Sequence, residues 1–201
     1  MPTTKQQDQQ RLRIAMAAAR HMSESGVSDF QLAKRKACQQ LAVSTTRNLP
    51  SNQEIKDALR EYQSLFKADI QVQQLKRLRA TAVEAMRFFQ QFSPRLAGDV
   101  LAGYANEHTS VELHLFAEYP EQISLFLMQE QIPYQEKQKR VSYGNEEYEF
   151  LPAFSFLADD VGVDILVFPT TALRRAPNSP VDGKPMQRAD LKAVERLATE
   201  A

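Results

Sequence analysis

Two stretches of sequence decide the fold, VLAGYANEHTSVELHLFAE at 100–118 and VGVDILVF at 161–168. Within them, residues 111–117 and 161–168 alternate between two faces, which is typical of β-strands. The first strand carries Val111, Leu113 and Leu115 on one face, and Glu112, His114 and Phe116 on the other. The second strand is apolar on both faces except at Asp164. Two acidic side chains, Glu112 and Asp164, are therefore expected inside apolar strands.

Further elements are expected on both sides of these two strands. The pattern predicts strands at 96–102, 111–117, 137–143, 146–157 and 161–168, and helices at 120–130 and from about Asp190. Turns at Gly144-Asn145 and at Asp159-Asp160 favour antiparallel hairpins. The order of elements indicates an α+β fold, a mixed sheet with its helices collected on one face.

The N-terminal residues 1–92 are predicted to be all-helical. Amphipathic helices are expected over 6–24, from Asp29 to Leu41, after the capping box Ser51-Asn-Gln-Glu54, and over 72–92. In the first of these helices the predicted buried stripe is Leu12, Ala15, Met16, Ala19 and Met22. The sequence thus predicts a helical region at 1–92, an α+β domain at 93–201, and no strand before about residue 96.

Composition excludes several classes of protein. The chain is 43% hydrophobic and 25% charged, as is usual for globular proteins, and has no apolar run of membrane-spanning length. Its start is polar and its one cysteine, Cys38, forms no disulfide framework, so a cytoplasmic protein is expected. Phosphate-binding P-loop, dinucleotide-binding, nucleophile-elbow and H-E-x-x-H motifs are missing.

The zero net charge hides an asymmetry. Residues 1–95 contain 16 Lys/Arg and 8 Asp/Glu, whereas residues 96–201 contain 9 Lys/Arg and 17 Asp/Glu. The halves could attract each other, or the basic half could meet an anionic partner, nucleic acid or an acidic protein. The basic clusters at 34–36 and 76–79 suit such a partner, but they also suit an ordinary solvated helix surface.

Three polar residues on the two central strands form a candidate site. Glu112 and His114 share a strand face at a spacing that two ligands of one cation can use. Asp164 on the other strand needs a cation or a hydrogen-bonding partner. Upstream, Gly103 provides a turn at which backbone can approach a phosphate. The alternative is structural, with Glu112 and His114 facing solvent and Asp164 paired with an arginine such as Arg95 or Arg174.

This arrangement resembles the nucleotidyltransferase superfamily of the DNA polymerase beta type. That family has a helix, a strand ending in a glycine-serine turn, a strand with two aspartates at i and i+2, and a later strand with a third aspartate. In the present sequence Gly103 matches the first glycine and Tyr104 stands at the serine. Glu112 and His114 stand at the carboxylate pair, and Asp164 at the third carboxylate. The resemblance covers roughly residues 86–168.

The resemblance implies a nucleotidyltransferase-like sheet, with transfer of a nucleotidyl group from a nucleoside triphosphate to an unknown acceptor. It implies catalytic Glu112 and Asp164, which together with His114 would hold Mg²⁺ or Mn²⁺. Gly103 and Tyr104 would bind the nucleotide. The segment 174–188 has four basic residues, Arg174, Arg175, Lys184 and Arg188, and could clamp a phosphate; it could also be a surface loop. The alternative function is a non-catalytic binding or regulatory protein on the same fold, with no membrane partner.

Overall fold

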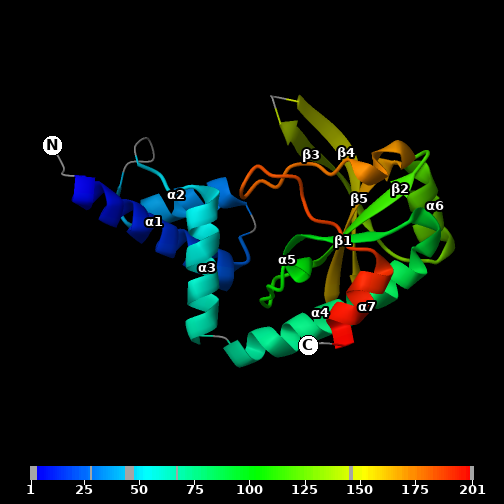
Figure 1. The fold of residues 1–201 in the computed structure, drawn as a ribbon, viewed down its shortest axis with the longest axis horizontal. Helices are drawn as coiled ribbons and strands as arrows, with labels where there is room; N and C mark the ends of the chain where they lie inside the picture. Colours follow the sequence, from blue (N-terminus) through cyan, green and yellow to red (C-terminus); the bar gives the residue numbers. More distant parts are fainter. Residues whose placement is uncertain (1–3, 28, 44–47, 67, 145–146, 200–201) are drawn as a thin grey trace. The chain divides into compact units, whose positions relative to one another are not determined.

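The chain divides into two compact units. The computed structural model describes residues 4–27, 29–43, 48–66, 68–144 and 147–199 (Figure 1). One unit consists of Met1–Gln71 with Pro180–Asp182, and the other of Val72–Ser179 with Gly183–Ala201. The division lies N-terminal to the boundary at residues 92 and 93 expected from the sequence, because most of the helix before that boundary packs on the sheet.

The first unit is helical. It contains α1 (Thr4–Ser25), α2 (Phe30–Gln40) and α3 (Asn52–Phe66). Asp29 caps α2 by accepting a hydrogen bond from the Leu32 amide, 2.6 Å away. The predicted capping box is present: the Glu54 amide donates to Ser51 Oγ (3.1 Å) and the Ser51 amide to Glu54 Oε2 (2.7 Å). The described residues of 1–92 contain no strand, as predicted.

The buried stripe of α1 differs from the prediction. Ile14, Ala15, Ala18 and Ala19 are buried, whereas Leu12 and Met16 are 60% and 56% exposed. The alanines pack α1 against α2 and α3, since small side chains let helices approach closely. The buried face is therefore set by the small residues, and the predicted stripe was wrong at Leu12 and Met16.

The second unit is an α+β domain, which confirms the fold class expected from the sequence. Its sheet has the order β1-β2-β5-β4-β3, with β2 and β5 parallel and the other pairs antiparallel. The strands are β1 (Arg95–Ala97), β2 (Val111–Ala117), β3 (Gln135–Gly144), β4 (Glu147–Ala158) and β5 (Val161–Pro169). The helices are α4 (Ala68–Phe88), η1 (Gln90–Phe92), α5 (Gly98–Leu101), α6 (Glu121–Gln129), η2 (Thr170–Arg174) and α7 (Leu191–Thr199).

The long helices of this unit cover one face of its sheet. The main core joins side chains of α4, α6 and α7 to the helix-facing residues of β2 and β5. Met86 and Phe89, from the helix predicted at 72–92, are fully buried there, whereas Val72 is 61% exposed. Figure 1 shows α4 and α7 together on this side of the sheet. The opposite face carries the candidate site.

The first predicted strand is shorter than expected. The sequence predicted a strand over 96–102, but β1 ends at Ala97 and the chain turns into α5. Gly98 has a φ of +71°, a conformation that favours glycine and ends the extended backbone. Gly98 therefore lies directly at the end of β1, beside the central strands.

Composition led us to expect no disulfide framework around Cys38 and no membrane-spanning segment. Cys38 is a free, buried thiol. In the described ranges, no helix combines the length and the apolar character needed to cross a bilayer.

Helix α4 should be required for the sheet unit to fold. A chain beginning at residue 72 should melt cooperatively, whereas a chain beginning at residue 93 should not, because it lacks the buried Leu78, Ala82, Met86 and Phe89. Circular dichroism melting of both fragments tests this. Equal cooperative melting of the two fragments would show that α4 is dispensable.

Candidate functional site

The face of the sheet opposite α4, α6 and α7 carries one row of polar residues. Glu112 lies opposite Asp164 in the parallel β2–β5 register, and Asp164 lies opposite Ser155 of β4. Ala97 of β1 lies opposite Glu112 at the other end. Side chains at paired positions point to the same side. The row therefore places both predicted carboxylates on neighbouring strands, facing the same way.

The Glu112 carboxylate already has a cation beside it. Lys139 of β3 donates from Nζ to Glu112 Oε1 at 3.1 Å, and His114 Nε2 lies 3.6 Å from the same oxygen. A Cβ atom on Gly98 would come within 2.7 Å of Glu112 Oε2. The carboxylate is thus enclosed by a lysine, an imidazole and the backbone at the end of β1.

These neighbours change the acidity of Glu112. Burial by itself would raise the pKa of this carboxyl group, but the adjacent His114 and the positive charge of Lys139 lower the pKa to about 2. Glu112 is consequently ionised at neutral pH. A carboxylate with so low a pKa is a weak general base.

Asp164 is satisfied by two hydroxyl groups. Ser110 donates from Oγ to Oδ2 at 2.5 Å, and Ser155 donates from Oγ to Oδ1 at 2.7 Å. Arg95, the arginine expected as a structural partner, donates instead to the carbonyl oxygens of Pro94 and Ser93. Hydrogen bonds from two serine side chains therefore hold the Asp164 carboxylate. The sequence had suggested a cation or an arginine in their place.

His114 is fully buried between Glu112 and Arg188, the last basic residue of the segment 174–188. Arg188 donates from Nε to His114 Nδ1 at 2.8 Å, so Nδ1 is unprotonated and a neutral ring carries its proton on Nε2. Burial lowers the pKa of His114, against the opposing effect of Glu112. His114 is therefore neutral at pH 7 and buried out of reach of a substrate.

Arg188 holds the chain between η2 and α7 against this face. Its Nη1 donates to the carbonyl oxygens of Ala172 (3.1 Å) and Arg175 (3.2 Å). Its guanidinium lies over the ring of Phe168, 4.4 Å from the centroid. Burial lowers its pKa to about 10, so it remains charged at neutral pH.

The other predicted nucleotide-binding residues lie elsewhere. A Cβ on Gly103 would have Arg79 Nη2 as its neighbour, at 3.9 Å, and the Tyr104 amide donates to the Asp99 carbonyl. Arg175 pairs with Glu147 at 2.6 Å. Arg174 is exposed on η2, and Lys184 is exposed in the loop that follows. None of the interactions recorded for the described residues joins these five to Glu112 or Asp164.

The donor set does not fit the divalent metal that the resemblance implies. Mg²⁺ requires near-octahedral oxygen ligands. The three predicted ligands are a carboxylate bound to Lys139, a carboxylate bound by two serines, and an imidazole whose Nδ1 is occupied by Arg188. Among the described residues, no group of three or more His, Cys, Asp or Glu side chains could hold a metal ion.

Sequence reasoning missed the partners of the predicted residues. Lys139, Ser110, Ser155 and Arg188 supply the hydrogen bonds, and Gly98 rather than Gly103 lies against Glu112. Gly98 could have been identified from its position, because it directly follows Ala97, the last residue of β1, which pairs with Glu112. Identifying Lys139, Ser110, Ser155 and Arg188 requires the strand register or the contacts of a distant segment.

Comparisons with known proteins give no family for this chain. No protein-family model matches it, and a search of curated proteins finds no match. The geometry therefore defines the class of protein, an α+β domain with a helical N-terminal region.

A Gly98→Ala substitution should destabilise the protein more than Gly183→Ala. Both glycines have a φ of +71°, but a Cβ at Gly98 meets the Glu112 carboxylate and a Cβ at Gly183 meets nothing within 4 Å. We expect a loss of about 1 kcal/mol for G183A from backbone strain and about 1–3 kcal/mol more for G98A. Urea denaturation measures both. In a Glu112→Ala background, Gly98→Ala should cost less than it does in the wild type; equal losses for the two glycines would contradict the close approach.

The ion pair of Glu112 should appear as a pH dependence of stability. The folded-state pKa of about 2 lies below the ordinary value of 4.5, so the contribution is present above pH 4.5 and is lost as the pH falls toward 2. The shift corresponds to about 3 kcal/mol. The stability difference between wild type and Glu112→Gln should shrink over this range, measured by urea denaturation with Glu118→Gln as the control. A constant difference would exclude the ion pair.

Proposed function

We propose that this chain is a non-catalytic binding protein, built on an α+β domain that resembles the nucleotidyltransferase fold. The observation that carries the proposal is that the three predicted metal ligands are already engaged by other side chains. Glu112 is bound by Lys139, Asp164 by Ser110 and Ser155, and His114 by Arg188. These are the positions at which the related enzymes would need free metal ligands. Nucleotidyl transfer by this chain stays a prediction from the resemblance.

The electrostatics of the helical unit favour an anionic partner. Acidic side chains there have internal partners: Asp8 and Glu54 pair with Arg11, Glu24 with Arg20, and Asp57 with Arg60. By contrast, no ion pair is recorded for Arg13, Arg35 or Lys36, which lie at least partly exposed on α1 and α2 of the described chain. The unit thus retains positive charges that are available to a polyanion.

Nucleic acid is the partner we propose. Its phosphates attract uncompensated Lys and Arg side chains and release counterions when they are neutralised, so that binding depends steeply on salt. The excess of Lys/Arg over Asp/Glu in residues 1–95, 16 to 8, points the same way. An acidic protein would bring fewer charges per unit length, and its binding would show a weaker salt dependence.

The double variant Arg35→Gln, Lys36→Gln should bind nucleic acid less tightly than the wild type. We expect affinity for a labelled 20-nucleotide RNA or DNA to fall at least about fivefold. The slope of the logarithm of the binding constant against the logarithm of the salt concentration should fall in magnitude by about 0.7 to 0.9 for each phosphate that the variant no longer neutralises. Fluorescence anisotropy between 50 and 200 mM salt measures both quantities.

The control carries the same change of charge elsewhere. Lys137→Gln, Lys192→Gln removes two exposed positive charges, one from β3 and one from α7, and should leave affinity and its salt dependence close to wild type. If the two double variants lost nucleic-acid affinity equally, net charge alone would explain the loss, which would contradict a role for α2. Thermal stabilisation that requires both magnesium and a nucleoside triphosphate would contradict the non-catalytic proposal and favour the enzyme.

A further inference from the structure

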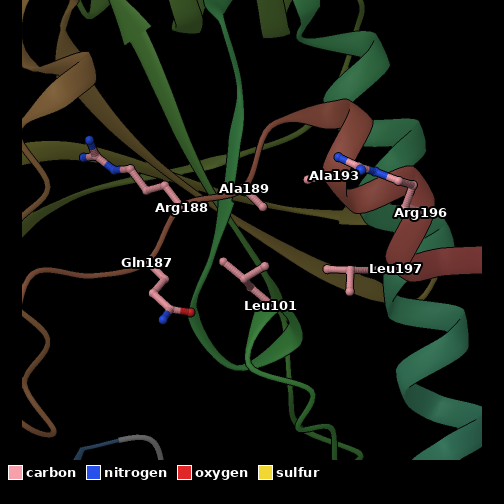
Figure 2. Close-up of a pocket in the computed structure, with 7 residues that line it drawn as sticks. All are labelled: Leu101, Gln187, Arg188, Ala189, Ala193, Arg196 and Leu197. Atoms are coloured by element: carbon pink, nitrogen blue, oxygen red, sulfur yellow. The ribbon is translucent and has the colours of Figure 1, made fainter. Parts of the chain in front are cut away.

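A second candidate binding site lies on the other face of the sheet, beside β1. It is a shallow, open depression of about 510 Å³ on the surface of the sheet unit. The lining residues come from α5, from the segment before α7, and from α7 itself: Leu101, Gln187, Arg188, Ala189, Ala193, Arg196 and Leu197. In Figure 2, Leu101 and Leu197 point toward one another across the pocket.

The pocket combines an apolar floor with a positive rim. Leu101, Ala189, Ala193 and Leu197 provide the apolar surface, and the exposed Arg196 lies on the same stretch of α7 as Ala193 and Leu197. None of the lining residues is acidic. A ligand with an aliphatic body and one negative group would match both parts.

The walls are fixed by interactions outside the pocket. Arg79 donates from Nη1 to the Leu197 carbonyl oxygen at 3.0 Å, and Arg87 pairs with Glu195 at 2.7 Å, so α7 is held against α4. On the other side, Ala189 exchanges two backbone hydrogen bonds of 2.9 Å with Leu96 of β1. A preformed pocket binds with a smaller ordering cost than one that must assemble.

The pocket is separate from the polar row. Because Ala189 pairs with β1 in an extended conformation, neighbouring side chains alternate between the two faces. Gln187 and Ala189 line the pocket, whereas the Arg188 guanidinium points away from it toward His114 (Figure 2). A ligand here would therefore touch neither Glu112 nor Asp164.

We infer that this pocket binds a small amphipathic anion, an aliphatic chain of moderate length that ends in a carboxylate or a phosphate. The apolar floor takes the chain and the Arg196 guanidinium takes the head group through charge-assisted hydrogen bonds. Binding in this pocket does not depend on nucleic-acid binding by the helical unit.

The test uses octanoate and octyl phosphate as probes of the full-length protein. Isothermal titration and heteronuclear NMR shifts should show saturable binding of at least one of them. Butyrate should bind at least about tenfold more weakly, because it buries four fewer methylene groups. Octanol should also bind at least about tenfold more weakly, because it lacks the charge. The stronger of the two charged probes identifies the head group.

Two variants and a control localise the site. Arg196→Gln should weaken octanoate binding about tenfold and leave octanol unchanged. Ala193→Leu should weaken octanoate binding, because the larger side chain takes up part of the apolar floor; leucine preserves the helix, and thermal melting checks the fold. Lys192→Gln on the same helix should bind like the wild type. Failure of both charged probes to saturate, equal affinity for octanol and octanoate, or unchanged binding by folded A193L would each overturn the inference.

Discussion

The parallel pairing of β2 with β5 is the constraint on which the rest of the sheet unit depends. Parallel strands cannot be joined by a tight turn, so the chain between Ala117 and Val161 must cross over. It does so through α6, which covers one face, and through the β3–β4 hairpin, whose second strand pairs antiparallel with β5. The register that results sets Glu112 opposite Asp164. One pairing thus determines both the apolar face and the polar row.

Both carboxylates of that row have partners from other parts of the chain, because an unpaired polar group costs several kcal/mol when it is removed from water. Asp164 uses two serines, one before β2 and one on β4, which are short side chains fixed by the sheet. Glu112 uses Lys139, a long side chain from an edge strand. These partners compete directly with a metal ion for the same oxygens, so the donor set is better suited to a stable face than to metal-assisted chemistry.

The sequence predicted what depends on local periodicity. Alternation in 111–117 and 161–168 predicted the faces of Glu112, His114 and Asp164, and the helix at 72–92 was predicted to pack through Met86 and Phe89. It failed where the answer depended on which surface a helix meets, as for Leu12 and Met16 on α1. It also failed where partners come from distant segments, since neither Lys139 nor Arg188 differs locally from any other surface cation.

The two edges of the sheet explain why those cations lie where they do. An open edge strand invites pairing with another chain, and proteins protect it with charge or with a covering segment. The β3 edge carries Lys137, Lys139 and Arg140, whereas the β1 edge is covered at Leu96 by the pairing of Ala189. Lys139 and Arg188 thus belong to the segments at the two edges, and their side chains extend inward to Glu112 and His114. The two segments that form or cover the edges of the sheet therefore also supply the cations that contact Glu112 and His114 at its centre.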